Sequence, residues 1–284
     1  MKSTTQRGFT LVEMIMVIVI TGIIGGMVAM FIRAPMQGYV DSARRADMTD
    51  IADTAMRRMA RDLRTALPNS VRISTVGVIT YLEFIPIITG GRYRNDVSGG
   101  AVAGNPLKFG IPPVTSFDAL VPFANLGIAV GDAIVVYNLG IPGATVYDGI
   151  NSTTVTAVAT GALPNESTIT IAAKAFPLDS CQPNPVTGAV NGCRYHVIRT
   201  PVTYVCNPVA GTLTRFSGYA IAPIQPTAGL PGGNLLASNV SACTFTYDAN
   251  VVAQSAGLVT LALTITEQGE SVSLYNAIHV NNVP

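Results

Sequence analysis

The sequence predicts an α+β protein in which one long N-terminal helix packs on an antiparallel, β-rich globular head. Three observations support this class. A run of nineteen uncharged residues, 14–32, lies close to the N-terminus. A charged segment with helical periodicity follows it and ends near residue 68. The remaining chain is rich in β-branched residues that Gly and Pro interrupt, which is typical of short strands joined by turns.

The apolar run predicts a transmembrane helix over residues 9–35. At about 1.5 Å of rise per residue, residues 14–32 reach across most of the roughly 30 Å hydrocarbon core of a bilayer. Lys2 and Arg7 precede the run, so the positive-inside rule predicts a single-pass protein with its head in the periplasm. A cleaved secretory signal is the competing interpretation, but its apolar core would be shorter and followed by a small-x-small site.

Two glycines in this run have the spacing of a helix-packing motif. Gly22 and Gly26 form a small-xxx-small pair that would let other helices approach closely. Glycine is also common in membrane helices without any such role, and the sequence leaves both interpretations open.

Residues 36–68 predict an amphipathic helix. Its apolar positions recur at a period of 3.6, and charged residues fill the other face. The arginines on that face favour a solvated surface, shared in part with neighbouring subunits, over a nucleic-acid or phospholipid site. From residue 68 onward eight basic residues stand against ten acidic ones, a net −2 that argues against a nucleic-acid partner.

Glu13 is the unusual residue of the N-terminal segment. A carboxylate in hydrocarbon costs several kcal/mol unless a partner neutralises it, and no basic residue follows within the next turns of the helix. The partner must be the bilayer interface, another chain or a newly formed charge. Cleavage after Gly8 would create such a charge, the α-amino group of Phe9.

The stretch "RGFTLVE" resembles the processing motif of type IV prepilins and pseudopilins. The resemblance implies that residues 1–8 are a leader peptide, that a prepilin peptidase cuts between Gly8 and Phe9, and that it methylates the Phe9 amine. It also implies that Glu13 pairs with the Phe9 amine of a neighbouring subunit during assembly. The expected partners are other major and minor pilins, the prepilin peptidase and the inner-membrane assembly platform. An ordinary signal anchor that happens to hold a glutamate is the alternative.

Residues 69–284 predict a β-rich head. Gln268 to Glu270 reads as the turn of a hairpin, whereas regions 88–131 and 222–237 show few strand signals and read as long loops. The strand candidates are 71–75, 78–87, 133–138, 153–158, 167–173, 194–206, 211–221, 240–248, 258–267 and 271–280.

Four cysteines and an export-type N-terminus predict two disulfides formed in an oxidising compartment. Three connectivities are possible. We prefer the nearest-neighbour pairs Cys181–Cys193 and Cys206–Cys243, with buried free thiols as the alternative. With two histidines and no CxxC spacing, the sequence predicts no metal site or cofactor, and no catalytic motif indicates an enzyme.

The sequence of the head, over residues 194–284, is similar to that of the larger minor pilins. These include the J component of type II secretion, the W-type minor pilin and, above all, the O-type minor pilin of the mannose-sensitive haemagglutinin (MSHA) pilus. The resemblance implies a minor type IV pilin that takes part in assembly, initiation or capping of an MSHA-like pilus. A type II secretion pseudopilin and a pilus-tip adhesin are the alternatives.

Overall fold

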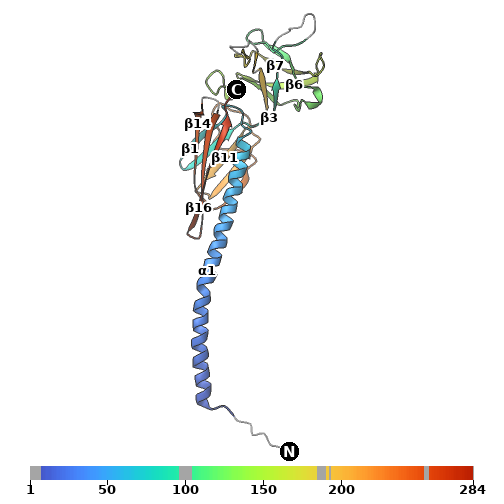
Figure 1. Ribbon diagram of the computed structural model, residues 1–284. Helices are drawn as coiled ribbons and strands as arrows, with labels where there is room; N and C mark the ends of the chain where they lie inside the picture. The colour runs from blue at the N-terminus through green and yellow to red at the C-terminus, as the bar shows by residue number, and fades with distance from the viewer. Residues whose placement is uncertain (1–7, 96–103, 184–189, 192, 253–255, 284) are drawn as a thin grey trace, which may run out of the picture. The chain divides into compact units, whose positions relative to one another are not determined.

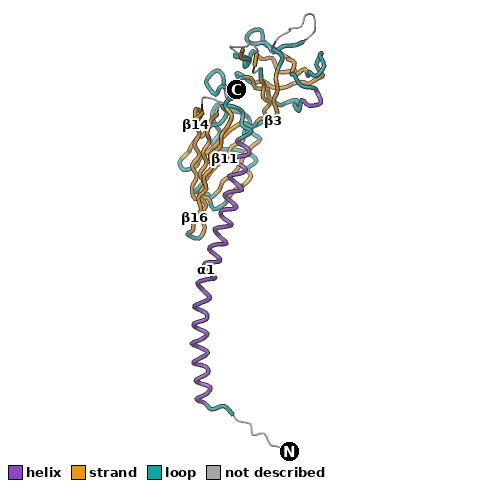
Figure 2. The backbone as a smooth tube through the Cα atoms, viewed as in Figure 1, coloured by secondary structure: helices purple, strands orange, loops and turns teal. Residues whose placement is uncertain are grey.

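The computed structural model describes residues 8–95, 104–183, 190–191, 193–252 and 256–283 (Figure 1). The chain divides into two compact units, residues 1–50 and residues 51–284. One helix, α1 (Leu11–Leu63), runs from the first unit into the second, and every other regular element belongs to the second unit. The predicted α+β class is confirmed, because a long apolar helix precedes a head built from antiparallel strands (Figure 2).

Helix α1 continues without a break through position 35, where the transmembrane and amphipathic segments were expected to meet. It ends at Leu63, and Thr65 and Ala66 close the last turn by donating to carbonyl oxygens three residues earlier. Pro68, which cannot continue a helix, follows.

Two sheets of the head are built from the strands that directly follow α1 and from the strands of the C-terminal part of the chain. A five-stranded sheet has the order β1-β2-β11-β12-β13, and a three-stranded sheet has the order β14-β15-β16. The predicted hairpin is confirmed, because Glu267 pairs with Glu270 across a two-residue turn whose residues both have positive φ. The strands are β1 (Arg72–Val76), β2 (Ile79–Phe84), β11 (Val202–Asn207), β12 (Thr212–Ser217), β13 (Asn234–Ala237), β14 (Val240–Val252), β15 (Ala256–Glu267) and β16 (Glu270–Asn281).

A third sheet closes on itself as a six-stranded antiparallel barrel. Its order is β3-β10-β5-β6-β7-β4, and a bridge between Tyr93 and Ala119 joins the two end strands. The backbone N–H of Arg94 donates to the carbonyl of Asp118, and that of Leu120 to the carbonyl of Arg92, each at 2.8 Å. The strands are β3 (Ile87–Arg92), β4 (Val114–Ala119), β5 (Ala133–Val136), β6 (Ser152–Thr160), β7 (Ser167–Lys174) and β10 (Arg194–Ile198).

Aromatic and aliphatic side chains fill this barrel. The ring of Phe117 meets that of Tyr195 edge-on at a centroid distance of 5.7 Å, and Tyr93 stands edge-on to Phe117 at 6.5 Å. All three are buried. Short elements complete this region: the 3₁₀ turns η1 (Phe123–Asn125) and η2 (Val146–Asp148), and the ribbon of β8 (Gln182–Pro183) and β9 (Val190–Asn191).

The barrel is an insertion between two adjacent strands of the five-stranded sheet. Strands β2 and β11 are hydrogen-bonded to each other, and the chain between them, Ile87 to Ile198, builds the barrel. The head therefore consists of two sheets and an inserted barrel.

Three details of the predicted strands are wrong. The candidate 194–206 is two strands of different sheets, β10 and β11, with Pro201, which has no N–H to donate to a ladder, between them. Region 88–131 holds most of β3 and all of β4, and region 222–237 holds β13. The glycine pair in β3, the Ser and Asp of β4 and the four-residue length of β13 weaken their local strand signals.

The barrel is bonded to the chain that follows α1. Leu67 and Ile85 pack against Val135 and Ile198 of the barrel in one buried cluster. The fully buried Asn138 side chain donates to the carbonyl of Pro68 at 2.6 Å. Because this junction buries apolar and polar groups together, it fastens the insertion to the helix end.

A buried ion pair lies beside this junction. The guanidinium of Arg72 bonds the Glu83 carboxylate at 2.7 and 3.0 Å and lies 3.6 Å from the ring centroid of Tyr147. The Tyr147 hydroxyl donates to the carbonyl of Ser70. Burial raises the pKa of Glu83, and the charge and hydrogen bonds of Arg72 oppose that rise.

Candidate functional site

The expected cleavage site lies immediately before α1. Gly8, Phe9 and Thr10 precede the first helical residue, Leu11, and adopt no regular structure. All three are exposed, with Phe9 at 83% of its full surface. The Gly8–Phe9 peptide bond is therefore outside the helical hydrogen-bond ladder, where a peptidase could reach it.

Thr10 caps the N-terminus of the helix. The backbone N–H of Glu13 donates to the Thr10 side-chain oxygen at 3.3 Å and to its carbonyl at 3.1 Å, and Met14 N–H donates to the same carbonyl. Threonine at the cap and glutamate three residues later is the spacing of a capping box. The role of Thr10 was missed in the sequence, although the pattern T-x-x-E within "FTLVE" could have revealed it.

Glu13 occupies the first turn of α1, where the helix dipole favours a negative charge. Among residues 8–95 and the later described ranges, no basic side chain forms an ion pair with it. Its pairing with the Phe9 amine of another subunit stays a prediction.

The first part of α1 exposes its apolar side chains. A stretch of 18 residues within the helix is strongly apolar, and none of it is buried. By length and composition this is the one helix, among the described residues, that could cross a membrane. A contiguous apolar surface of this length needs a covering partner, either lipid or other helices.

The small and polar residues of this segment are open to a partner. A Cβ atom placed on Gly22 or Gly26 would meet nothing within 4 Å. Thr21 satisfies its hydroxyl by donating to the carbonyl of Val17 at 2.6 Å, so it presents no unpaired polar group to an apolar environment. The packing role of Gly22 and Gly26 stays a prediction.

The C-terminal part of α1 is tied to the head through Asp62. Its carboxylate accepts from the Tyr204 hydroxyl at 2.7 Å and from the Arg215 guanidinium at 2.8 Å. Burial and then this hydrogen bond raise the pKa of Tyr204, so the phenol stays protonated as the donor. The interaction joins the helix to β11 and β12.

The cysteines are joined as Cys181–Cys193 and Cys206–Cys243. The first bond lies in the barrel insertion, and the second connects β11 to β14 and so links the two sheets. Among the described residues no three His, Cys, Asp or Glu side chains are grouped to hold a metal ion.

Comparison with known proteins bears on the N-terminus alone. The family described as the prokaryotic N-terminal methylation motif matches residues 3–31. No curated protein and no solved structure matches the chain. The matched segment includes Gly8, Phe9 and Glu13 and all but the last residue of the uncharged run 14–32.

The motif and the uncovered apolar helix support membrane anchoring and an N-terminus of the kind that a prepilin peptidase processes. The class that they support is the type IV pilins and pseudopilins.

Proposed function

We propose that the protein is a minor subunit of a type IV pilus of the MSHA type, involved in assembly, initiation or capping of the filament. The observation that carries this proposal is the exposed apolar surface of α1 within a matched methylation motif. That surface is stable in a bilayer before assembly and against neighbouring helices after it.

In this proposal, cleavage and methylation at the N-terminus prepare the subunit for assembly. Cleavage after Gly8 leaves Phe9 as an exposed N-terminal amine one residue before the Thr10 cap. Methylation of that amine keeps its positive charge, so it can still pair with Glu13 of a neighbour. The charge pair compensates the cost of placing a carboxylate in an apolar filament core.

The inserted barrel supports a minor rather than a major role. A regular filament repeats one subunit along its length, and a head enlarged by a whole barrel limits how closely such heads can pack. In this proposal the helix joins the filament through other pilins and the assembly platform. The head lies first in the periplasm and then on the filament surface.

The test is the location and stoichiometry of the protein in its native host. Filaments sheared from cells are separated from membranes, and the protein is quantified against the major subunit. We expect it in the filament fraction at a small fraction of the major subunit, with fewer filaments when it is deleted. Its absence from shed filaments, together with the loss of an exported enzyme on deletion, would instead assign it to type II secretion.

A further inference from the structure

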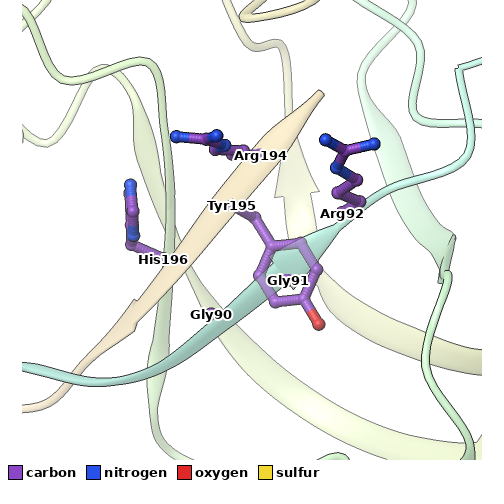
Figure 3. A pocket seen from close by; sticks show the side chains of 6 residues that line it. All are labelled: Gly90, Gly91, Arg92, Arg194, Tyr195 and His196. Atoms are coloured by element: carbon purple, nitrogen blue, oxygen red, sulfur yellow. The ribbon is translucent and has the colours of Figure 1, made fainter. Parts of the chain in front are cut away.

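A hollow of about 260 Å³ lies on the outer face of the barrel, between β3 and β10. We call it the β3–β10 hollow. The two strands pair so that Arg194 is opposite Arg92 and His196 is opposite Gly90. Figure 3 shows the Arg92, Arg194 and His196 side chains on one side of the strand pair and the Tyr195 ring on the other. Its lining residues are Gly90, Gly91, Arg92, Arg194, Tyr195 and His196.

Two glycines make room for this hollow. Gly90 has no side chain to fill the space opposite His196, and a Cβ there would come within 2.9 Å of the Tyr195 carbonyl oxygen. A Cβ on Gly91 would come within 2.7 Å of the Tyr195 hydroxyl. The close approach of the β10 backbone therefore requires glycine at position 90, and the Tyr195 ring requires it at position 91. The outer face is left open at Gly90.

The two arginines of the hollow have no acidic partner among the described residues. Their guanidinium groups are exposed and belong to directly opposed positions, an arrangement of like charges that destabilises a strand pair. Other arginines of this region are paired. Arg94 bonds the Glu166 carboxylate, and Arg199 bonds that of Asp132 at 2.8 Å.

His196 adds a polar atom that lacks a partner. Its Nε2 is buried without a hydrogen bond to any described residue. Burial, with the nearby charge of Arg194, lowers the pKa of His196 to about 4, so the ring is neutral at pH 7 and carries one N–H. A buried polar atom without a partner is costly, and a bound ligand would satisfy it.

We propose that the β3–β10 hollow binds an oxyanion, a carboxylate, sulfate or phosphate group, through the guanidinium groups of Arg92 and Arg194 and the His196 imidazole. Guanidinium forks match the geometry of such groups and bind them by charge-assisted hydrogen bonds. A bound anion would also neutralise the repulsion between the two arginines. The oxyanion can come from free inorganic ions or from the acidic sugars of a polysaccharide, and the site is independent of the filament role proposed above.

The test uses the full chain in detergent micelles at constant ionic strength. Isothermal titration measures the binding of inorganic phosphate, of sulfate and of a galacturonate oligomer. The variants are Arg92→Gln, Arg194→Gln and His196→Gln, and the matched control is Lys108→Gln, which removes an exposed positive charge elsewhere in the insertion.

We expect binding by the wild type, a roughly tenfold or greater loss of affinity in each arginine variant, and unchanged affinity in Lys108→Gln. The unliganded arginine variants should unfold at the same temperature as the wild type or higher, because the like-charge repulsion is gone. Tighter binding of the oligomer than of phosphate or sulfate would identify a polysaccharide as the source, and the reverse would identify free anions.

Either of two results would overturn the proposal. One is that the wild type binds none of the three probes at millimolar concentration. The other is that Lys108→Gln loses as much affinity as the arginine variants, since this would reveal attraction by net charge alone.

Discussion

The N-terminal part of α1 and the inserted barrel are both rich in apolar residues, yet they use them in opposite ways. The helix exposes large apolar side chains along its length, whereas the barrel buries Tyr93, Phe117 and Tyr195 in its own interior. The helix segment therefore needs lipid or neighbouring subunits to cover it, and the barrel needs neither. The difference shows that the surface that needs a covering partner and the core that is complete by itself lie in separate parts of the chain.

The largest expected effect tests the first region of this comparison, the exposed N-terminal segment. In Gly8→Asp, a charged side chain stands at the proposed cleavage site, so we expect no processing and an intact mass that still includes the leader. Nothing lies within 4 Å of a Cβ at Gly8, so the substitution leaves the described contacts unchanged. Glu13→Ala is the matched variant: it should be cleaved normally but fail to enter filaments. Normal incorporation of Glu13→Ala into filaments would contradict the proposed pairing of Glu13 with the Phe9 amine of a neighbouring subunit.

The next largest effect tests the second region, the buried core of the barrel. Phe117→Ala removes a fully buried ring that packs on Tyr93 and Tyr195, and we expect a loss of about 3–5 kcal/mol in the free energy of unfolding. Chemical denaturation of the full chain measures this loss, and leader cleavage should be unaffected. A loss below about 1 kcal/mol would mean that the ring is not part of a closed core.

A smaller effect sharpens the comparison within α1, at the point where the helix becomes part of the head. Asp62→Ala leaves the Tyr204 hydroxyl and the Arg215 guanidinium without their acceptor, which should cost about 1–3 kcal/mol of stability. Asp53→Ala is the control, because its pair with Arg57 is exposed and is worth only about 0.3–0.5 kcal/mol. Equal costs in the two variants would contradict the assigned role of Asp62.

The smallest effect is a pH dependence of the barrel. The pKa of His196 is about 4 in the folded state against 6.5 in an ordinary environment, so the unfolded chain binds the extra proton below pH 6.5. Stability should fall by about 1 kcal/mol from pH 7 to pH 5.5 through this residue. Thermal unfolding of His196→Gln should show a weaker pH dependence than that of the wild type. Identical pH profiles for the two proteins would contradict the buried, neutral histidine.

Local sequence was sufficient for the N-terminal segment and for some strands. The uncharged run 14–32 and the motif around Gly8 are contiguous, and the hairpin at Gln268 depends on neighbouring residues alone. Each of these features could be predicted because the physical cause and the sequence signal occupy the same stretch of chain.

The barrel could not be predicted in this way. Its closure depends on a bridge between Tyr93 and Ala119, and its origin as an insertion depends on the pairing of β2 with β11. Such pairings join residues far apart in sequence and leave no local pattern. The β3–β10 hollow was missed for the same reason, because Arg92 and Arg194 become neighbours only through strand register.

The most direct test of the account is the intact mass and N-terminal sequence of the protein recovered from membranes of its native host. We expect a chain that begins at N-methylated Phe9, with residues 1–8 removed. A chain that still begins at Met1, in cells with an active prepilin peptidase, would contradict it and leave an anchored β-rich protein whose Glu13 has no assigned partner.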